Sequence, residues 1–254
     1  MVDSVSASSE LIFNGHWVAF SKSNTLPKEP WPVQWVETYD ECARHPYHLL
    51  LDDDNLLLIV HGQCVYSAKE CYQTVLQDQH GFIRTAVKRK NKYPTELIDG
   101  TAGWGREALT LALAGIKIFA IERAELPVIF LKYALEFIFP QTFIEVHHQP
   151  LDEYLQKQSH QIIEYIYCDP LFFESKRSLS KKSMQLLYHE DRRLFGGQQD
   201  DSLLKALKGH HIQSLLIKQP KNAPRLFNNN CVIIERYQKT CRYDLYCLNG
   251  AQLY

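Results

Sequence analysis

The sequence predicts an α/β fold, with a doubly wound and largely parallel sheet preceded by a small strand-rich region. From Glu96 onward, short apolar strands alternate with helices, a pattern typical of βαβ units. A glycine-rich turn follows the first of these strands, and the last two strands follow each other with no helix between them. A chain of 254 residues can bury the core that such a fold requires.

The amino-terminal third differs in character from the rest of the chain. Its short apolar or alternating runs are 11–20, 31–36 and 56–60, and prolines and an acidic turn separate them. We therefore expect a small N-terminal α/β region over residues 1–87 and a larger domain over residues 88–254.

The larger domain shows its elements in order. Strands are expected at 96–99, 117–121, 143–147, 162–168, 214–218, 231–237 and 242–248. Helices are expected at 105–114, 126–139 and 151–158, with further helical material within 179–207. The last two strands predict a terminal antiparallel hairpin on the parallel sheet, which resembles the Rossmann-like fold of class I methyltransferases.

Charge and cysteine content exclude several classes of protein. With 28 Lys and Arg against 29 Asp and Glu, the formal net charge is −1, so any nucleic-acid partner must bind a local patch. The seven cysteines lack the close pairs of a zinc site or a disulfide framework. We find no secretory leader and no apolar run of about 18 residues, and we expect a soluble cytoplasmic protein with no membrane partner and no metal.

A glycine-rich turn lies where the first strand of the larger domain leads into a helix. Gly100, Gly103 and Gly105 carry no side chains there, so a ligand can approach the backbone, and N–H groups at the helix start favour an anion. Glu122 ends the second strand, the usual place for a ribose-binding acid. These features predict a nucleotide-like cofactor. They leave open NAD, S-adenosylmethionine and a turn without a ligand.

A second motif, Asp169-Pro170-Leu171-Phe172, ends the fourth strand and resembles the tetrapeptide of amino-group methyltransferases. In a doubly wound sheet this strand lies beside the first, so we expect Asp169 to face the glycine turn. A purine amine is a poor nucleophile because its lone pair is delocalised into the ring. Asp169 and the Pro170 carbonyl can each accept one N–H and so orient that lone pair. Phe172 would stack on an extruded base.

Basic residues cluster at three places in the larger domain. The clusters are 88–92, 176–182, and Lys218 with Lys221 and Arg225. We expect all three near the carboxyl ends of the strands or on the approach to them, where phosphate contacts would position a nucleic acid.

Six blocks of the sequence together resemble one family, the small-subunit ribosomal RNA guanine-N2 methyltransferase J group. The blocks are 97–108, 121–123, 169–172, 176–184, 217–224 and 242–246. The resemblance implies S-adenosylmethionine as cofactor, methylation of a guanine N2 as the reaction, and 16S ribosomal RNA or the small ribosomal subunit as partner.

The resemblance also implies a set of site residues. The implied catalytic residues are Asp169, Pro170 and Phe172. The residues expected to hold the cofactor are Asp99, Gly103, Arg106, Glu107, Glu122, Arg123, Gln149 and Asp169. Two features depart from the family: Gln149-Pro150 replaces small hydroxyl residues, and 77–84 replaces a basic, glycine-rich segment. Alternatives therefore remain: an amino methyltransferase acting on another RNA or on DNA, an oxidoreductase, or a non-catalytic nucleotide-binding module.

Overall fold

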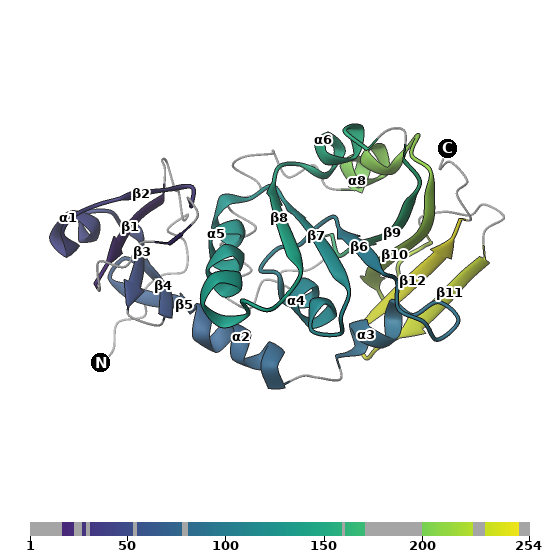
Figure 1. The fold of residues 1–254 in the computed structure, drawn as a ribbon, viewed down its shortest axis with the longest axis horizontal. Helices are drawn as coiled ribbons and strands as arrows, with labels where there is room; N and C mark the ends of the chain where they lie inside the picture. Colours follow the sequence, from purple (N-terminus) through teal and green to yellow (C-terminus); the bar gives the residue numbers. More distant parts are fainter. Residues whose placement is uncertain are drawn as a thin grey trace.

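The computed structural model contains two sheets joined by helices (Figure 1). It describes residues 17–22, 27–28, 31–52, 55–77, 81–158, 161–170, 200–225 and 232–248. No helix in these ranges is long and apolar enough to span a bilayer.

The smaller sheet has five strands in the order β2-β1-β3-β4-β5. These strands are β1 (Trp17–Ser21), β2 (Val33–Trp35), β3 (Tyr47–Asp52), β4 (Asn55–Val60) and β5 (Gln63–Ser67), and α1 (Tyr39–Ala43) precedes β3. The sequence pattern indicated β1, β2 and β4 but not β3 or β5. β3 is buried along nearly its whole length and so does not alternate, and β5 is short and starts with exposed residues.

The larger sheet has seven strands in the order β11-β12-β10-β9-β6-β7-β8. Its strands are β6 (Glu96–Asp99), β7 (Lys117–Glu122), β8 (Ile144–His148), β9 (Ile163–Cys168), β10 (Ile212–Pro220), β11 (Val232–Tyr237) and β12 (Cys241–Cys247). β12 inserts between β10 and β11 and runs antiparallel to both, whereas the pairs among β6 to β10 are parallel. The predicted doubly wound sheet with a terminal antiparallel hairpin is therefore confirmed.

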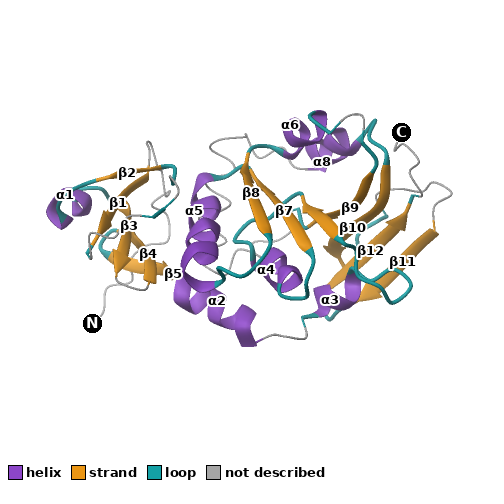
Figure 2. Ribbon diagram, viewed as in Figure 1, coloured by secondary structure: helices purple, strands orange, loops and turns teal. Residues whose placement is uncertain are grey.

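Helices cover both faces of the larger sheet (Figure 2). They are α2 (Ala68–Gln77), α3 (Phe82–Ala86), α4 (Arg106–Ala112), α5 (Glu125–Tyr133), the π-helix η1 (Ala134–Ile138), α6 (Leu151–Gln156) and α8 (Asp200–Leu207). Apolar side chains of α6 and α8 form one core cluster with β9 and β10, and those of α2, α4 and α5 form the other. The predicted helix 126–139 is thus an α-helix continued by a π-helix.

The two sheets share one of these cores. Buried side chains from Trp17 in β1 to Leu245 in β12 belong to a single apolar cluster. Trp31 packs edge-on against Tyr133 at the end of α5, with ring centroids 6.1 Å apart. Helices α2 and α3, which lie before residue 88, contact α4 of the larger domain. The boundary at 87/88 stays a prediction.

Candidate active site

The glycine turn joins β6 to α4, and its glycines serve different purposes. Gly103 and Gly105 have φ of 52° and 72°, in the left-handed region that favours glycine. A Cβ on Gly105 would overlap the side chain of Leu131, and one on Gly100 would lie 2.8 Å from Leu151 Cδ2. At Gly103 the nearest such atom is the Thr101 carbonyl oxygen at 3.9 Å. Gly100 and Gly105 therefore allow close packing of leucine side chains, and the approach of a ligand to this turn stays a prediction that the space beside Gly103 favours.

Glu122, at the end of β7, ties this turn to the neighbouring strand. One carboxylate oxygen accepts a hydrogen bond from the Gly103 N–H at 2.7 Å, and the other accepts one from the Ala124 N–H at 2.8 Å. Burial raises the pKa of Glu122, although both backbone hydrogen bonds act in the opposite direction. The predicted ribose-binding acid thus lies beside the glycine with open space around it.

Aromatic residues outside the turn hold Trp104 in place. The Tyr66 ring of β5 stacks on the Trp104 ring with centroids 4.1 Å apart, and Phe130 packs edge-on at 5.5 Å. The Tyr72 hydroxyl of α2 donates to the Trp104 carbonyl oxygen at 2.9 Å. The smaller sheet and α2 therefore pack against the glycine turn and support it. Local sequence patterns did not reveal this contact between distant segments.

The Asp169 tip lies directly against the glycine turn. β9 pairs with β6, and the Gly100 N–H donates to the Tyr167 carbonyl at 2.8 Å. The Asp169 N–H donates to the Thr101 hydroxyl at 2.6 Å. The structure thus brings together the two motifs that the sequence placed at the ends of adjacent strands. Leu171 and Phe172 lie outside the described residues, so the stacking role of Phe172 stays a prediction.

Lys218 of β10 provides the cation beside the Asp169 carboxylate. Its Nζ lies 2.5 Å from Asp169 Oδ2 and 3.5 Å from Glu107 Oε1. Burial raises the pKa of Asp169 to about 6; Lys218 opposes this shift and Glu107 adds to it. Burial lowers the pKa of Lys218, but the two carboxylates outweigh it and leave that pKa raised. At pH 7 the pair is therefore ionised, and the Asp169 carboxylate is a hydrogen-bond acceptor only.

Two further polar groups lie among these carboxylates. Asp99 is 1% exposed, accepts a hydrogen bond from the Thr101 N–H at 3.3 Å, and has a pKa raised well above its usual value by burial and by Glu107. The Tyr167 side chain is also buried, and its hydroxyl has no hydrogen-bond partner among the described residues. The sequence analysis did not identify Tyr167, because an apolar strand pattern gives no signal for one buried hydroxyl.

The remaining predicted cofactor residues lie around the same edge of the sheet but face other partners. Arg106 donates to the Thr74 hydroxyl of α2 at 3.0 Å, so its guanidinium is directed to that helix. Gln149 Oε1 accepts a hydrogen bond from Lys157 at 2.6 Å. The Arg123 carbonyl oxygen lies 3.2 Å from His148 Nε2, and the charge of the Arg123 side chain acts to lower the pKa of Glu122. The side chains of Arg106 and Gln149 are thus bonded to partners other than Asp169, whereas Arg123 lies near Glu122.

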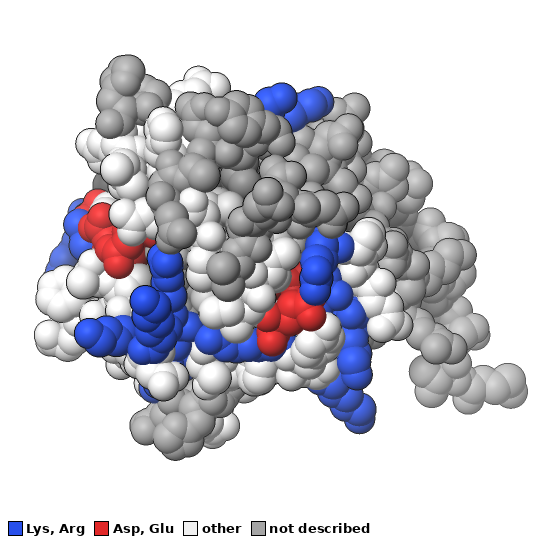
Figure 3. Space-filling view, turned by 90° about the vertical axis from the view of Figure 1, so that its right-hand side faces the viewer, with Lys and Arg blue, Asp and Glu red and all other residues white. Residues whose placement is uncertain are grey.

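Of the three basic clusters, one lies elsewhere than expected. Arg89 reaches Ser214 in the amino-terminal half of β10, and Thr95 bonds Glu164 at the start of β9. The turn at 89–92 is therefore on the amino side of the sheet, where the chain approaches β6, and not at the carboxyl ends of the strands. The cluster 176–182 lies outside the described residues. Figure 3 shows the side of the molecule that carries β11 and β12, where the blue Lys and Arg groups are interrupted by red acidic side chains.

The comparisons with known proteins agree with this arrangement. Residues 57–248 match the family described as "Putative SAM-dependent methyltransferase", where SAM is S-adenosylmethionine. The chain belongs to this methyltransferase family. The methyltransferase is 30% identical over 233 residues to "Ribosomal RNA small subunit methyltransferase J" of Cellvibrio japonicus, covering 83% of this chain and 85% of that relative. The protein with the same name from Pasteurella multocida is 28% identical over 222 residues, with the same two coverages.

A solved structure shows the same fold. The SAM-dependent methyltransferase from Neisseria gonorrhoeae aligns with a TM-score of 0.57 at 19% identity, over 92% of this chain and 97% of that one. Together with the family match, the fold decides between the two cofactors that the glycine turn left open. The cofactor of the methyltransferase is S-adenosylmethionine.

The residues of the site fit such a cofactor. A Cβ on Gly103 would meet no atom closer than 3.9 Å. The acidic side chains of Glu107, Glu122 and Asp169 outnumber the cations Lys218 and Arg123 beside them, and Asp99 adds a carboxyl group whose pKa is raised. An excess of carboxylates favours a ligand that carries a sulfonium cation. The methyltransferase thus presents an acidic, glycine-lined edge at the carboxyl ends of β6, β7 and β9.

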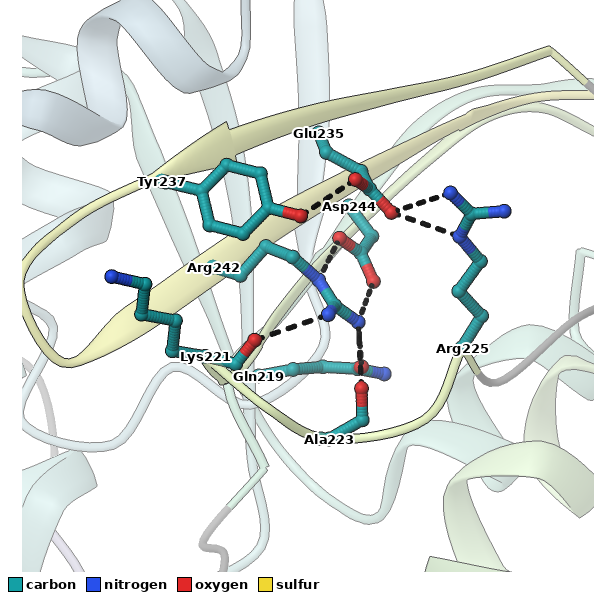
Figure 4. A network of polar contacts seen from close by, with 8 residues as sticks. All are labelled: Gln219, Lys221, Ala223, Arg225, Glu235, Tyr237, Arg242 and Asp244. Atoms are coloured by element: carbon teal, nitrogen blue, oxygen red, sulfur yellow. Dashed lines mark hydrogen bonds and ion pairs between the residues drawn. The ribbon is translucent and has the colours of Figure 1, made fainter.

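A buried polar network fixes the segment that follows β10 (Figure 4). Arg242 of β12 forms an ion pair with Asp244, with 2.6 Å between Nε and Oδ1, and its Nη2 also donates to Gln219 Oε1 at 3.1 Å. The same guanidinium donates to the carbonyl oxygens of Lys221 and Ala223 at 3.2 and 3.1 Å. The end of β10, which carries Lys218, is therefore anchored to β12 in the methyltransferase.

Proposed function

We propose that this methyltransferase transfers a methyl group from S-adenosylmethionine to the exocyclic N2 of a guanine in 16S ribosomal RNA. The observation that carries the proposal is the position of Asp169, whose own N–H bonds it to the glycine turn and whose carboxylate pairs with Lys218. The names of the two relatives support the RNA substrate, because both are called small-subunit ribosomal RNA methyltransferases.

In this proposal the chain first orients the amine. As the nitrogen–methyl bond forms, the sulfur–methyl bond would break and S-adenosylhomocysteine would leave, and the proton lost by the amine would pass to the Asp169 carboxylate and then to solvent. Asp169 accepts one N–H of the guanine amine, and the Pro170 carbonyl accepts the other. With both hydrogens held, the nitrogen lone pair points towards the cofactor, which supplies an electrophilic methyl group on its sulfonium. Phe172 stacks on the extruded base.

The cofactor contacts follow from where the carboxylates and the open backbone lie. Gly103 allows close approach, and Glu122 accepts hydrogen bonds from the ribose hydroxyls. Glu107 attracts the cationic methionine end, and the Asp99 carboxyl group hydrogen-bonds to it. Arg106, Arg123 and Gln149 complete the proposed set of contacts.

The test is methylation of undermodified small ribosomal subunits with labelled cofactor. The methyl group is then located by nuclease digestion and mass spectrometry. We expect label on N2 of one guanine, and a loss of at least about 100-fold in rate for Asp169→Ala. Asp152→Ala is the matched control, because Asp152 is exposed on α6. Label on DNA, on another RNA or on another atom would contradict the proposed substrate, and full activity of Asp169→Ala would contradict the role of Asp169.

A further inference from the structure

We propose that Lys218 is a positioning residue for Asp169: it fixes the orientation and the charge of the carboxylate that receives the substrate amine. The inference rests on the proposed function and deepens it. It replaces the sequence-based interpretation of Lys218 as a phosphate contact, and the experiment below distinguishes the two.

The first support is the geometry of the pair. β10 lies beside β9 in parallel register, with Ile217 opposite Cys168, so the next residues on the two strands are Lys218 and Asp169. Lys218 Nζ contacts Asp169 Oδ2, and among the described residues Oδ1 has no hydrogen-bond partner. The lysine therefore fixes one carboxylate oxygen and leaves the other to accept the amine hydrogen.

The second support is the electrostatic surroundings of Asp169. The titratable groups that influence it or are influenced by it, besides Lys218, are Glu107 of α4, Asp99 of β6, Tyr167 and Cys168 of β9, and Tyr243 and Cys241 of β12. Each of these groups is an acid, and among the described residues Lys218 is the cation that contacts the carboxylate. Without that cation, burial and the charge of Glu107 would act on Asp169 unopposed and raise its pKa.

The third support is that the lysine is itself held in place. Its Nζ lies 6.0 Å from the centroid of the Tyr243 ring, the residue opposite it on β12. Gln219, the next residue, is bound by the buried Arg242. Lys218 is also only 24% exposed in its side chain, and two carboxylates already share its ammonium. An ammonium so neutralised is a poor site for a phosphate.

The experiment compares Lys218→Met and Lys218→Arg with wild type, using Lys208→Met as control because Lys208 is exposed after α8. Single-turnover rates at saturating RNA and cofactor are measured from pH 5 to pH 9. Asp169 must be ionised to accept the amine, so the rate falls as the pH drops through its pKa. We expect Lys218→Met to move this acid limb upward by about one pH unit or more. Lys218→Arg and Lys208→Met should keep the limb near that of wild type.

Other outcomes would overturn the inference. If Lys218 contacted a phosphate, Lys218→Met would keep its single-turnover rate at saturating RNA but would have a raised KM for RNA. The slope of log binding constant against log salt concentration would also become shallower by about one. Either that pattern or an acid limb unmoved in Lys218→Met contradicts a positioning role. If Lys218→Met does not fold, as judged by its thermal melt, Lys218→Gln takes its place, with the same expected shift. Wild type that fails to methylate 16S RNA contradicts the proposed function instead, so the two failures are distinguishable.

Discussion

Removing one hydroxyl group, in Tyr72→Phe, should weaken both the fold and the binding of the cofactor. The hydroxyl belongs to a fully buried side chain and donates to the Trp104 carbonyl oxygen, between the two positive-φ glycines of the turn. The substitution leaves that carbonyl without its donor, at a cost of about 1–3 kcal/mol. For a chain of this size, each kcal/mol lowers the Tm by about 2–4 °C.

The effect on binding follows from the position of Trp104 in the turn. If about 1.4 kcal/mol of the loss arises from loosening of the turn, the Kd for S-adenosylmethionine rises about tenfold. Thermal melts and isothermal titration calorimetry measure the two quantities. Tyr165→Phe is the control, because the Tyr165 hydroxyl is buried and has no hydrogen-bond partner among the described residues. The reasoning is refuted if Tyr72→Phe keeps the Tm and the Kd of wild type. It is also refuted if Tyr165→Phe loses as much thermal stability and affinity as Tyr72→Phe.

Two further predictions concern the same turn. Gly105→Ala should destabilise the protein more than Gly115→Ala in urea unfolding. Both positions have positive φ, but only at Gly105 would the new Cβ overlap Leu131; equal losses would contradict the packing role. Asp99→Asn tests pH dependence in the cofactor-free protein. Because the folded pKa of Asp99 is raised, its contribution to stability is full below the unfolded pKa and is lost as the pH rises through the folded pKa. The variant should therefore gain stability over wild type as the pH rises from 4 to 8, and a pH-independent difference would refute this.

Much of the larger domain is predictable from sequence because its elements are local and periodic. The alternation of strands and helices predicts where β6 to β12 lie along the chain. Because parallel strands end at one edge of a sheet, the same pattern also predicts that Asp169 lies beside the glycine turn. The smaller sheet is harder to predict. β3 is buried on both faces, and its run of three leucines shows no period of two.

Contacts between distant segments could not be read from the sequence. The pairing of Lys218 with Asp169 depends on the register of β10 against β9, and the stacking of Tyr66 on Trp104 depends on how the two sheets pack. A pattern of glycines likewise does not say which one faces a ligand: Gly100 and Gly105 face leucine side chains.

The position of β12 has a consequence for biosynthesis. β12 leaves the ribosome after both of its neighbours, yet it occupies an interior place between β10 and β11. Until residues 241–247 emerge, the nascent chain has bare edges on β10 and β11 and lacks Arg242, which anchors the segment behind Lys218. Bare strand edges invite pairing with other chains. A stop codon before residue 241 should therefore give an aggregation-prone product rather than a slightly shorter enzyme.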